Sequence, residues 1–183
     1  MSKKKEVTLE EKLKEAIIPK EEQPYEIPDN WEWVKIISIM DIRDGTHDSP
    51  KYVDKGFPLV TSKNLKNNEI DFKNVKYISE EDMLKINQRS KVEKGDVLYA
   101  MIGTIGNPVY VNVESLNSYA VKNVAIFKPF DKKMGKYIFN YLNSFNFQQI
   151  VNSKLKGSTQ KFIPLNILRS LKLPLPPLEE QER

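Results

Sequence analysis

The sequence predicts a mixed α/β (α+β) fold, built as one domain with a short N-terminal appendage. Short runs of apolar and β-branched residues, of which 120–127 is the clearest, are typical of strands. Segments with apolar residues at helical spacing, such as 134–150, predict amphipathic helices. A chain of 183 residues with 39% hydrophobic and 30% charged residues can bury a core, as a globular domain does.

Composition excludes several classes of protein. The chain has no cysteine, which excludes disulfides, thiol catalysis and cysteine-based metal sites. His47 is the only histidine, so a histidine cluster around a metal is excluded as well. No run approaches the roughly 18 apolar residues of a membrane span, and the N-terminus lacks the apolar stretch of a secretory signal. We therefore expect a cytoplasmic protein without a membrane partner.

Residues 1–24 predict a helix followed by a charged linker. Thr8 and Glu11 have the spacing of a capping box, and Pro19 ends the helical pattern. A helix that packs on its own domain and a helix that contacts a partner fit this pattern equally well.

The domain proper is expected over residues 25–178. Trp31 and Trp33 have the spacing of two side chains on one side of a strand, which favours packing over stacking on a nucleobase. The polar and turn-rich residues 41–52 predict a surface loop.

The next segments alternate between apolar runs and polar turns. Ser79 has the position of an N-cap, so a short helix should follow it. The expected elements are strands over 57–61 and 70–78, a polar basic stretch over 62–68, and a helix over 80–88.

A short apolar run over 96–101 leads into Gly103 and Gly106. Glycines at the end of a strand permit a close approach of the backbone to another group. The segment lacks the third glycine of a dinucleotide-binding fingerprint and the Gly-Lys-Ser/Thr of a phosphate-binding loop. We expect strands over 109–113 and 120–127 after it.

The period of the apolar residues changes near residue 134. One amphipathic helix is expected to about residue 150, with Gly157 ending it or the turn after it. Pro164 suits the first turn of a short helix over 165–170, a strand should cover 171–174, and 179–183 should begin another helix.

Catalytic patterns fit the sequence poorly. The run Asn107-Pro108-Val109-Tyr110 is similar to the Asn-Pro-Pro-Tyr of amino-methyltransferases, but its third residue is Val and no glycine-rich cofactor motif precedes it. The acids and lysine of a metal-dependent nuclease do not occur at the required spacing. The sequence also has no Gly-x-Ser-x-Gly motif to supply a nucleophilic serine that His47 could activate. The net charge of +4 permits nucleic acid as a partner without requiring it.

Seven segments in order give a resemblance to a known family. They are IPDNWEWVK (27–35), GTHDSPKY (45–52), PLVTSKNL (58–65), GDVLYAMIGTIG (95–106), KNVA (122–125), GSTQ (157–160) and LPLPPLEEQ (173–181). Taken in this order along the chain, the segments resemble those of a target recognition domain of the specificity (S) subunit of type I restriction-modification systems.

The resemblance implies a curved, largely antiparallel sheet with a small helical part. It also implies sequence-specific binding of double-stranded DNA at one half of a split target, without catalysis by this chain. The partners implied are modification (methyltransferase) subunits and a restriction subunit. The cofactors S-adenosylmethionine, ATP and magnesium would belong to those subunits, and none to this chain.

A full subunit of this family carries two recognition domains separated by long helices. This sequence has one such domain and ends where the spacer helix would begin, at 179–183. A half-subunit, a fragment and an excised domain are all compatible with this, and so are a homodimer and pairing with a second recognition domain. The alternative function is a protein-interaction module that docks a methyltransferase subunit without stable DNA binding of its own.

Residue type and loop position select the candidate contacts, since Lys neutralises phosphates while His, Asn and Gln read base edges. Candidate base contacts are Thr46, His47, Lys63, Asn64, Thr104 and Gln160. Candidate phosphate contacts are Lys51, Lys66, Lys122, Lys154, Lys156 and Lys161. Gly103, Gly106 and Gly157 are expected to shape the loops.

Overall fold

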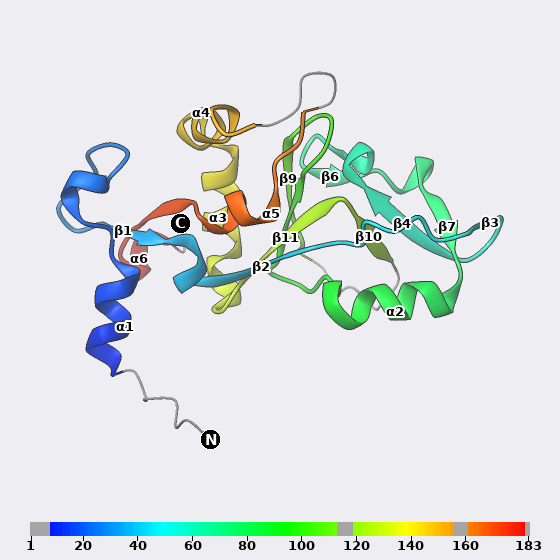
Figure 1. The fold of residues 1–183 in the computed structure, drawn as a ribbon, viewed down its shortest axis with the longest axis horizontal. Coiled ribbons are helices and arrows are strands. Elements are labelled where there is room, and N and C mark those ends of the chain that lie inside the picture. Colours follow the sequence, from blue (N-terminus) through cyan, green and yellow to red (C-terminus); the bar gives the residue numbers. More distant parts are fainter. Residues whose placement is uncertain (1–7, 113–118, 156–160, 182–183) are drawn as a thin grey trace.

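The computed structural model describes residues 8–112, 119–155 and 161–181 of the chain. It confirms the mixed α/β fold and the largely antiparallel pairing of the strands. The strands of the described residues form two four-stranded sheets and two two-stranded pairs. Figure 1 shows one sheet at the middle of the molecule, with helices at one end and the second sheet at the other.

The central sheet has the order β2-β11-β8-β9, and all of its strands are antiparallel. The strands are β2 (Met40–Asp44), β8 (Val97–Ala100), β9 (Gly106–Tyr110) and β11 (Val124–Pro129). Every residue of β11 is buried, because apolar cores cover both of its faces. Phe127 packs into one core and Ile126 into the other, as the alternation of side chains along a strand requires.

The second sheet has the order β10-β4-β7-β3. Its strands are β3 (Tyr52–Val53), β4 (Phe57–Thr61), β7 (Lys76–Ile78) and β10 (Ala120–Lys122). The pair β10 and β4 is parallel, and the other two pairs are antiparallel. Helix α2 (Glu80–Ser90) packs beside β10 and β4 and begins at the predicted cap, where the Ser79 hydroxyl accepts a hydrogen bond from Asp82 N–H at 3.1 Å.

Short elements connect β4 to β7. They are the 3-10 turns η3 (Ser62–Asn64) and η4 (Phe72–Asn74), with the paired strands β5 (Leu65–Lys66) and β6 (Glu69–Ile70) between them. The single strand expected over 70–78 is therefore wrong: only its two ends, in β6 and β7, are extended.

At the helical end of the molecule, the single helix predicted over 134–150 is wrong. Instead of one helix over 134–150, η5 (Lys132–Met134) is followed by α3 (Gly135–Asn143) and α4 (Phe145–Asn152). Ser144 interrupts the helix with an extended backbone (ψ 147°), and its hydroxyl accepts a hydrogen bond from Phe147 N–H. Serine competes for backbone hydrogen bonds and so favours a cap over a helix interior.

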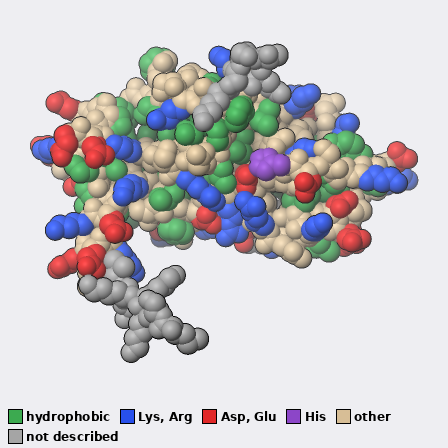
Figure 2. Space-filling model, viewed as in Figure 1, with side chains coloured by type: hydrophobic (Ala, Val, Ile, Leu, Met, Phe, Trp, Pro, Cys, Tyr) green, Lys and Arg blue, Asp and Glu red, His purple; other side chains and the backbone are tan. Residues whose placement is uncertain are grey.

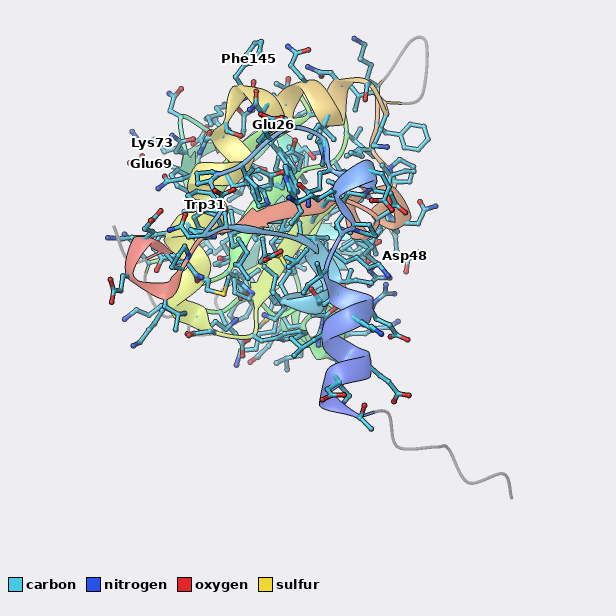
Figure 3. All side chains as sticks on the ribbon, turned by 90° about the vertical axis from the view of Figure 1, so that its left-hand side faces the viewer. Glu26, Trp31, Asp48, Glu69, Lys73 and Phe145 are labelled. Atoms are coloured by element: carbon cyan, nitrogen blue, oxygen red, sulfur yellow. The ribbon has the colours of Figure 1, made fainter. Side chains whose placement is uncertain are left out.

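The same end of the molecule contains the paired strands β1 (Glu32–Lys35) and β12 (Lys172–Leu175). The remaining elements there are the 3-10 turn η2 (Ile36–Ser38) and the helices α5 (Leu165–Arg169) and α6 (Leu178–Gln181). Trp33 is fully buried and donates its indole N–H to Tyr25 O, which excludes it from stacking on a base. Trp31 lies beside α3 and α6 (Figure 3), where its indole N–H donates to Glu180 Oε2 at 3.0 Å.

The N-terminal helix α1 (Leu9–Ala16) begins with the predicted capping box between Thr8 and Glu11. It projects from the body of the molecule (Figures 1 and 3). The residues after it, including η1 (Lys20–Glu22), are anchored, since Ile18 is buried and donates its N–H to Trp33 O at 2.7 Å. The domain boundaries at 24 and 178 stay a prediction.

Two further expectations about strands are wrong. Residues 41–44 belong to strand β2, in which Met40, Ile42 and Asp44 face inward. The segment 120–127 forms two strands of different sheets, separated by Asn123 with φ at +54°. No helix within the described ranges is long and apolar enough to cross a membrane.

Candidate nucleic-acid interface

A groove of about 490 Å³ lies where the two four-stranded sheets meet. One wall comes from β4, η3 and β7, which present Lys63 and Lys76, and the other comes from the loop between β8 and β9, which presents Thr104. Asn123, the link between β10 and β11, lines the groove as well. Among the described residues that line it there is no carboxylate, so the fixed charge of the groove is positive. Such a lining suits a polyanion.

The loop between β8 and β9 is held by the segment that precedes α5. Gly103 N–H donates to Lys161 O and Ile163 N–H donates to Met101 O, each at 3.0 Å. Gly103 has φ at +77° and Gly106 has φ at +109°, conformations that L side chains rarely adopt. The glycines therefore shape the loop that carries Thr104, and this pairing brings Lys161 close to it.

A second hollow, of about 370 Å³, lies between the end of β2 and helix α2. Thr46 and His47 line it, together with Lys85 and Arg89 of α2. Gly45 allows the backbone after β2 to pass close to β10, because a Cβ at this residue would lie 2.2 Å from Val121 O. Gly45 N–H donates to Val124 O, and Thr46 N–H donates to Val121 O.

His47 joins the two hollows through its ring. Nδ1 lies 2.9 Å from Asn123 Oδ1, and Nε2 lies 2.8 Å from Asp44 Oδ2. Asp44 is buried and also accepts a hydrogen bond from Arg89 Nη2 at 2.9 Å. The hydrogen bond to Asn123, with that to Asp44 next, raises the pKa of His47 above its usual 6.5. Both ring nitrogens are thus engaged by neighbouring side chains, and the raised pKa favours the protonated form of the ring.

The raised pKa predicts how His47 contributes to stability. Because the native state binds the proton more tightly, the contribution is fully present below about pH 6.5 and is lost as the pH rises through the raised native pKa. We expect His47→Ala to destabilise the protein at acidic pH and to have less effect at alkaline pH. Urea unfolding at several pH values measures this, and the NMR resonance of the single imidazole gives the pKa directly. An imidazole pKa below 6.5 would contradict the prediction.

Asn64 has a structural place in the wall of the groove. It is 4% exposed, its Oδ1 accepts hydrogen bonds from the N–H and hydroxyl of Thr61, and its Nδ2 donates to Asp71 O and Asn74 O. A carboxamide with all of these bonds has no free group for a base. We therefore remove Asn64 from the candidate base contacts.

The candidate lysines differ in whether their ammonium groups already have a partner in the structure. Lys66 lies 3.1 Å from Asp71, whose carboxyl pKa is lowered to about 2, first by a hydrogen bond from Asn74 and then by Lys66. Lys122 donates to the Ser49 hydroxyl at 2.7 Å. Lys51, Lys63, Lys154 and Lys161 are exposed. Lys156, Gly157 and Gln160 lie outside the described residues, so their assignments stay predictions.

The structure adds arginines that the sequence reading did not select. Three of the four arginines of the chain converge on β2: Arg43 lies on it, Arg169 donates twice to Ile42 O, and Arg89 bonds to Asp44. Figure 2 shows Lys and Arg side chains gathered next to the histidine on the face turned to the viewer. The three arginines are far apart in the sequence, so the sequence alone does not show that they cluster. The small number of arginines in the chain was the one feature that could have singled them out.

Comparisons with known proteins place this fold in a family. The model of the "Type I restriction modification DNA specificity domain" matches residues 28–183. The chain is 27% identical over 179 residues to the type I restriction enzyme EcoAI specificity subunit of Escherichia coli, covering 91% of this chain and 28% of that protein. It is also 27% identical over 164 residues to the MjaVIII specificity subunit of Methanocaldococcus jannaschii, covering 86% of this chain and 38% of that one.

Solved structures show the same fold. The HsdS subunit from Thermoanaerobacter tengcongensis superposes with a TM-score of 0.61 at 20% identity, over 94% of this chain and 39% of that chain. The S subunit of a type I system from M. genitalium gives 0.56 at 15% identity, over 86% of this chain and 38% of that chain. The chain thus spans less than two fifths of each of these relatives. Since the family model covers most of its length, the chain belongs to the family of type I restriction modification DNA specificity domains.

Proposed function

We propose that this chain binds double-stranded DNA sequence-specifically and reads one half-site of a target for a type I restriction-modification complex. The specificity subunits among its relatives support this role by name. The single structural observation that carries it is the groove between the sheets, which has Lys63 and Lys76 in its walls and no carboxylate among the described residues that line it. Lysines would position the phosphates, and the loops would reach the base edges.

The chain would contribute recognition without catalysis. Modification subunits would methylate adenine and a restriction subunit would cleave, using S-adenosylmethionine, ATP and magnesium that those subunits bind. This division of labour would place the protein in the cytoplasm with its DNA. A second recognition domain, or a second copy of this chain, would read the other half-site.

Salt dependence tests the electrostatic part of this proposal. Each neutralised phosphate lowers the slope of log affinity against log salt by about 0.9. Lys63, selected above as a candidate base contact, is assigned here to a phosphate because it shares the wall of the groove with Lys76. Changing Lys63 and Lys76 to alanine together should make the slope shallower by roughly 1.8, and should weaken binding to all duplexes alike. Fluorescence anisotropy over a salt series measures both quantities.

Lys14→Ala provides a matched control, because Lys14 is exposed on the projecting helix α1, away from the groove. Its slope should equal that of the unchanged protein. Salt-independent binding, or an equal loss of slope in the Lys14 variant, would refute the role of the groove. If no duplex binds while the chain captures a methyltransferase subunit, the interaction-module alternative gains.

A further inference from the structure

Asn123 has an unusual backbone at the crossing of the two sheets. It is one of four non-glycine residues with positive φ among those the structure describes, all of them asparagines. Its N–H donates to Thr46 O, and its carbonyl accepts from the Ser62 hydroxyl at 2.7 Å and from Met101 N–H at 3.3 Å. Three separate segments therefore hold this residue in place. Backbone strain that is fixed in this way is concentrated at functional sites.

The side chain of Asn123 is oriented as well. Asp44 Oδ2 can only accept a hydrogen bond, so His47 Nε2 carries a proton, and Asn123 Oδ1 can only accept, so Nδ1 carries one too. This contact uses the carboxamide oxygen. The Nδ2 group has no hydrogen-bond partner among the described residues, and Asn123 lines the groove between the sheets. The groove thus contains a hydrogen-bond donor in a fixed orientation.

We propose that Asn123 is a specificity-determining residue that donates from Nδ2 to the keto oxygen of a guanine or thymine, with His47 as the positioning residue for its amide. This inference rests on the proposed DNA-binding function. A free carboxamide recognises adenine by donating to N7 and accepting from the N6 amino group. With Oδ1 already bonded to His47, Asn123 can only donate, and the keto bases present major-groove acceptors at O6 or O4. One position of the target should therefore be a keto base.

The arrangement also makes the base preference depend on pH. Asp44 contacts the ring of His47 directly, Arg89 bonds to Asp44, and the side chains of Asp48, Asp82 and Lys85 line the same hollow. When the ring of His47 loses one proton, the proton on Nε2 stays because that nitrogen donates to Asp44, and Nδ1 becomes an acceptor. The amide of Asn123 then turns to donate Nδ2 to His47 and presents Oδ1 to the groove. The preference at that position should shift toward the amino groups of adenine and cytosine.

Selection of bound duplexes from a random library, with the full 183-residue chain, tests the inference. At about pH 6, where the imidazole is charged, one position should be enriched in guanine or thymine. Asn123→Asp keeps the acceptor for His47 and tolerates positive φ but cannot donate. It should lose about five- to tenfold discrimination at that one position while the other positions keep theirs. Its added negative charge weakens all sequences, so ratios between duplexes are compared.

Three further variants separate reading from folding and test the role of His47. Asn123→Gly accepts the backbone conformation and removes the side chain, so it should lose the same preference. Asn107→Gly is the matched control, because Asn107 also has positive φ (+45°) but lines a different hollow beside α3 and α4. It should leave the selected sequence unchanged. In His47→Ala the preference should be weak and no longer change between about pH 6 and 9.

The outcomes distinguish the inference from the function beneath it. If the unchanged chain selects no sequence, the proposed DNA reading fails. If it selects a sequence and the Asn123 variants retain every position of it, DNA reading stands and the role of Asn123 is overturned. A preference for adenine or cytosine at acidic pH at the position that depends on Asn123 would likewise overturn the orientation assigned to the amide.

Discussion

Asp96→Ala is expected to destabilise the protein by about 3–5 kcal/mol, because it takes the buried carboxylate away from the largely buried ammonium group of Lys128. Asp96 is fully buried, and its carboxylate accepts hydrogen bonds from Lys128 Nζ at 2.6 Å, from Lys132 Nζ and from Glu93 N–H. The Lys128 side chain is only 11% exposed. It would keep Lys91 O and the carboxylate of Glu93, which together cannot replace a buried anion.

Urea unfolding with a shared m-value measures the loss. Asp96→Asn keeps the shape and removes the charge, so it separates the ion pairs from the packing. Asp48→Ala is the control: that side chain is exposed, and the change should stay within about 0.5 kcal/mol. A loss below about 1 kcal/mol in Asp96→Ala would show that the cluster contributes no more than a surface pair.

Gly45→Ala is the second change expected to have a large effect. The added methyl group would lie 2.2 Å from Val121 O and 2.5 Å from Val121 C, and neither backbone atom can move aside without breaking β10. We expect a loss of about 3 kcal/mol in the free energy of unfolding, at the upper end of overpacking effects. The contact between His47 and Asn123 should loosen, which lowers the pKa of His47 toward 6.5.

Unfolding and the NMR titration of His47 measure the two effects in one protein sample. Gly103→Ala is the matched control, because a Cβ at Gly103 meets nothing within 4 Å and only its positive φ is strained. That strain should cost about 1–2 kcal/mol and leave the titration of His47 unchanged. Equal losses in the two variants, with an unshifted titration in Gly45→Ala, would show that the sheets tolerate separation at this point.

Local chemistry was sufficient to predict where several helices begin. Thr8 and Ser79 were assigned as caps from their neighbours three residues away, and the structure confirms both. Strand β2 could not be identified in this way. Asp44 and the carbonyl of Ile42 are bonded by arginines 45 and 127 residues away in the chain, so the polar residues that suggested a loop are satisfied by tertiary contacts.

The candidate interface was predicted in part, for a similar reason. Lys63 and Thr104 were selected as polar loop residues, and the structure brings both to one groove. Asn64 has the same residue type as a base reader, but its amide is used by four hydrogen bonds, two with Thr61 in its own turn and two with Asp71 O and Asn74 O at the next turn. Asn123 was read as the interior of an apolar strand, and only its positive φ and its contact with His47 reveal its position between the sheets.

The crossing of the two sheets bears on how such a domain could diversify. Two main-chain hydrogen bonds join the sheets, from Thr46 N–H to Val121 O and from Asn123 N–H to Thr46 O. The bond from Gly45 N–H to Val124 O continues the pairing of β2 with β11 up to this junction. Main-chain bonds of this kind tolerate many side chains, whereas the loop tips that carry Lys63 and Thr104 are exposed and line the groove. Substitutions at the tips can therefore accumulate without turning one sheet against the other. Under the proposed function, a lineage could change the DNA sequence that it reads while it inherits an unchanged frame.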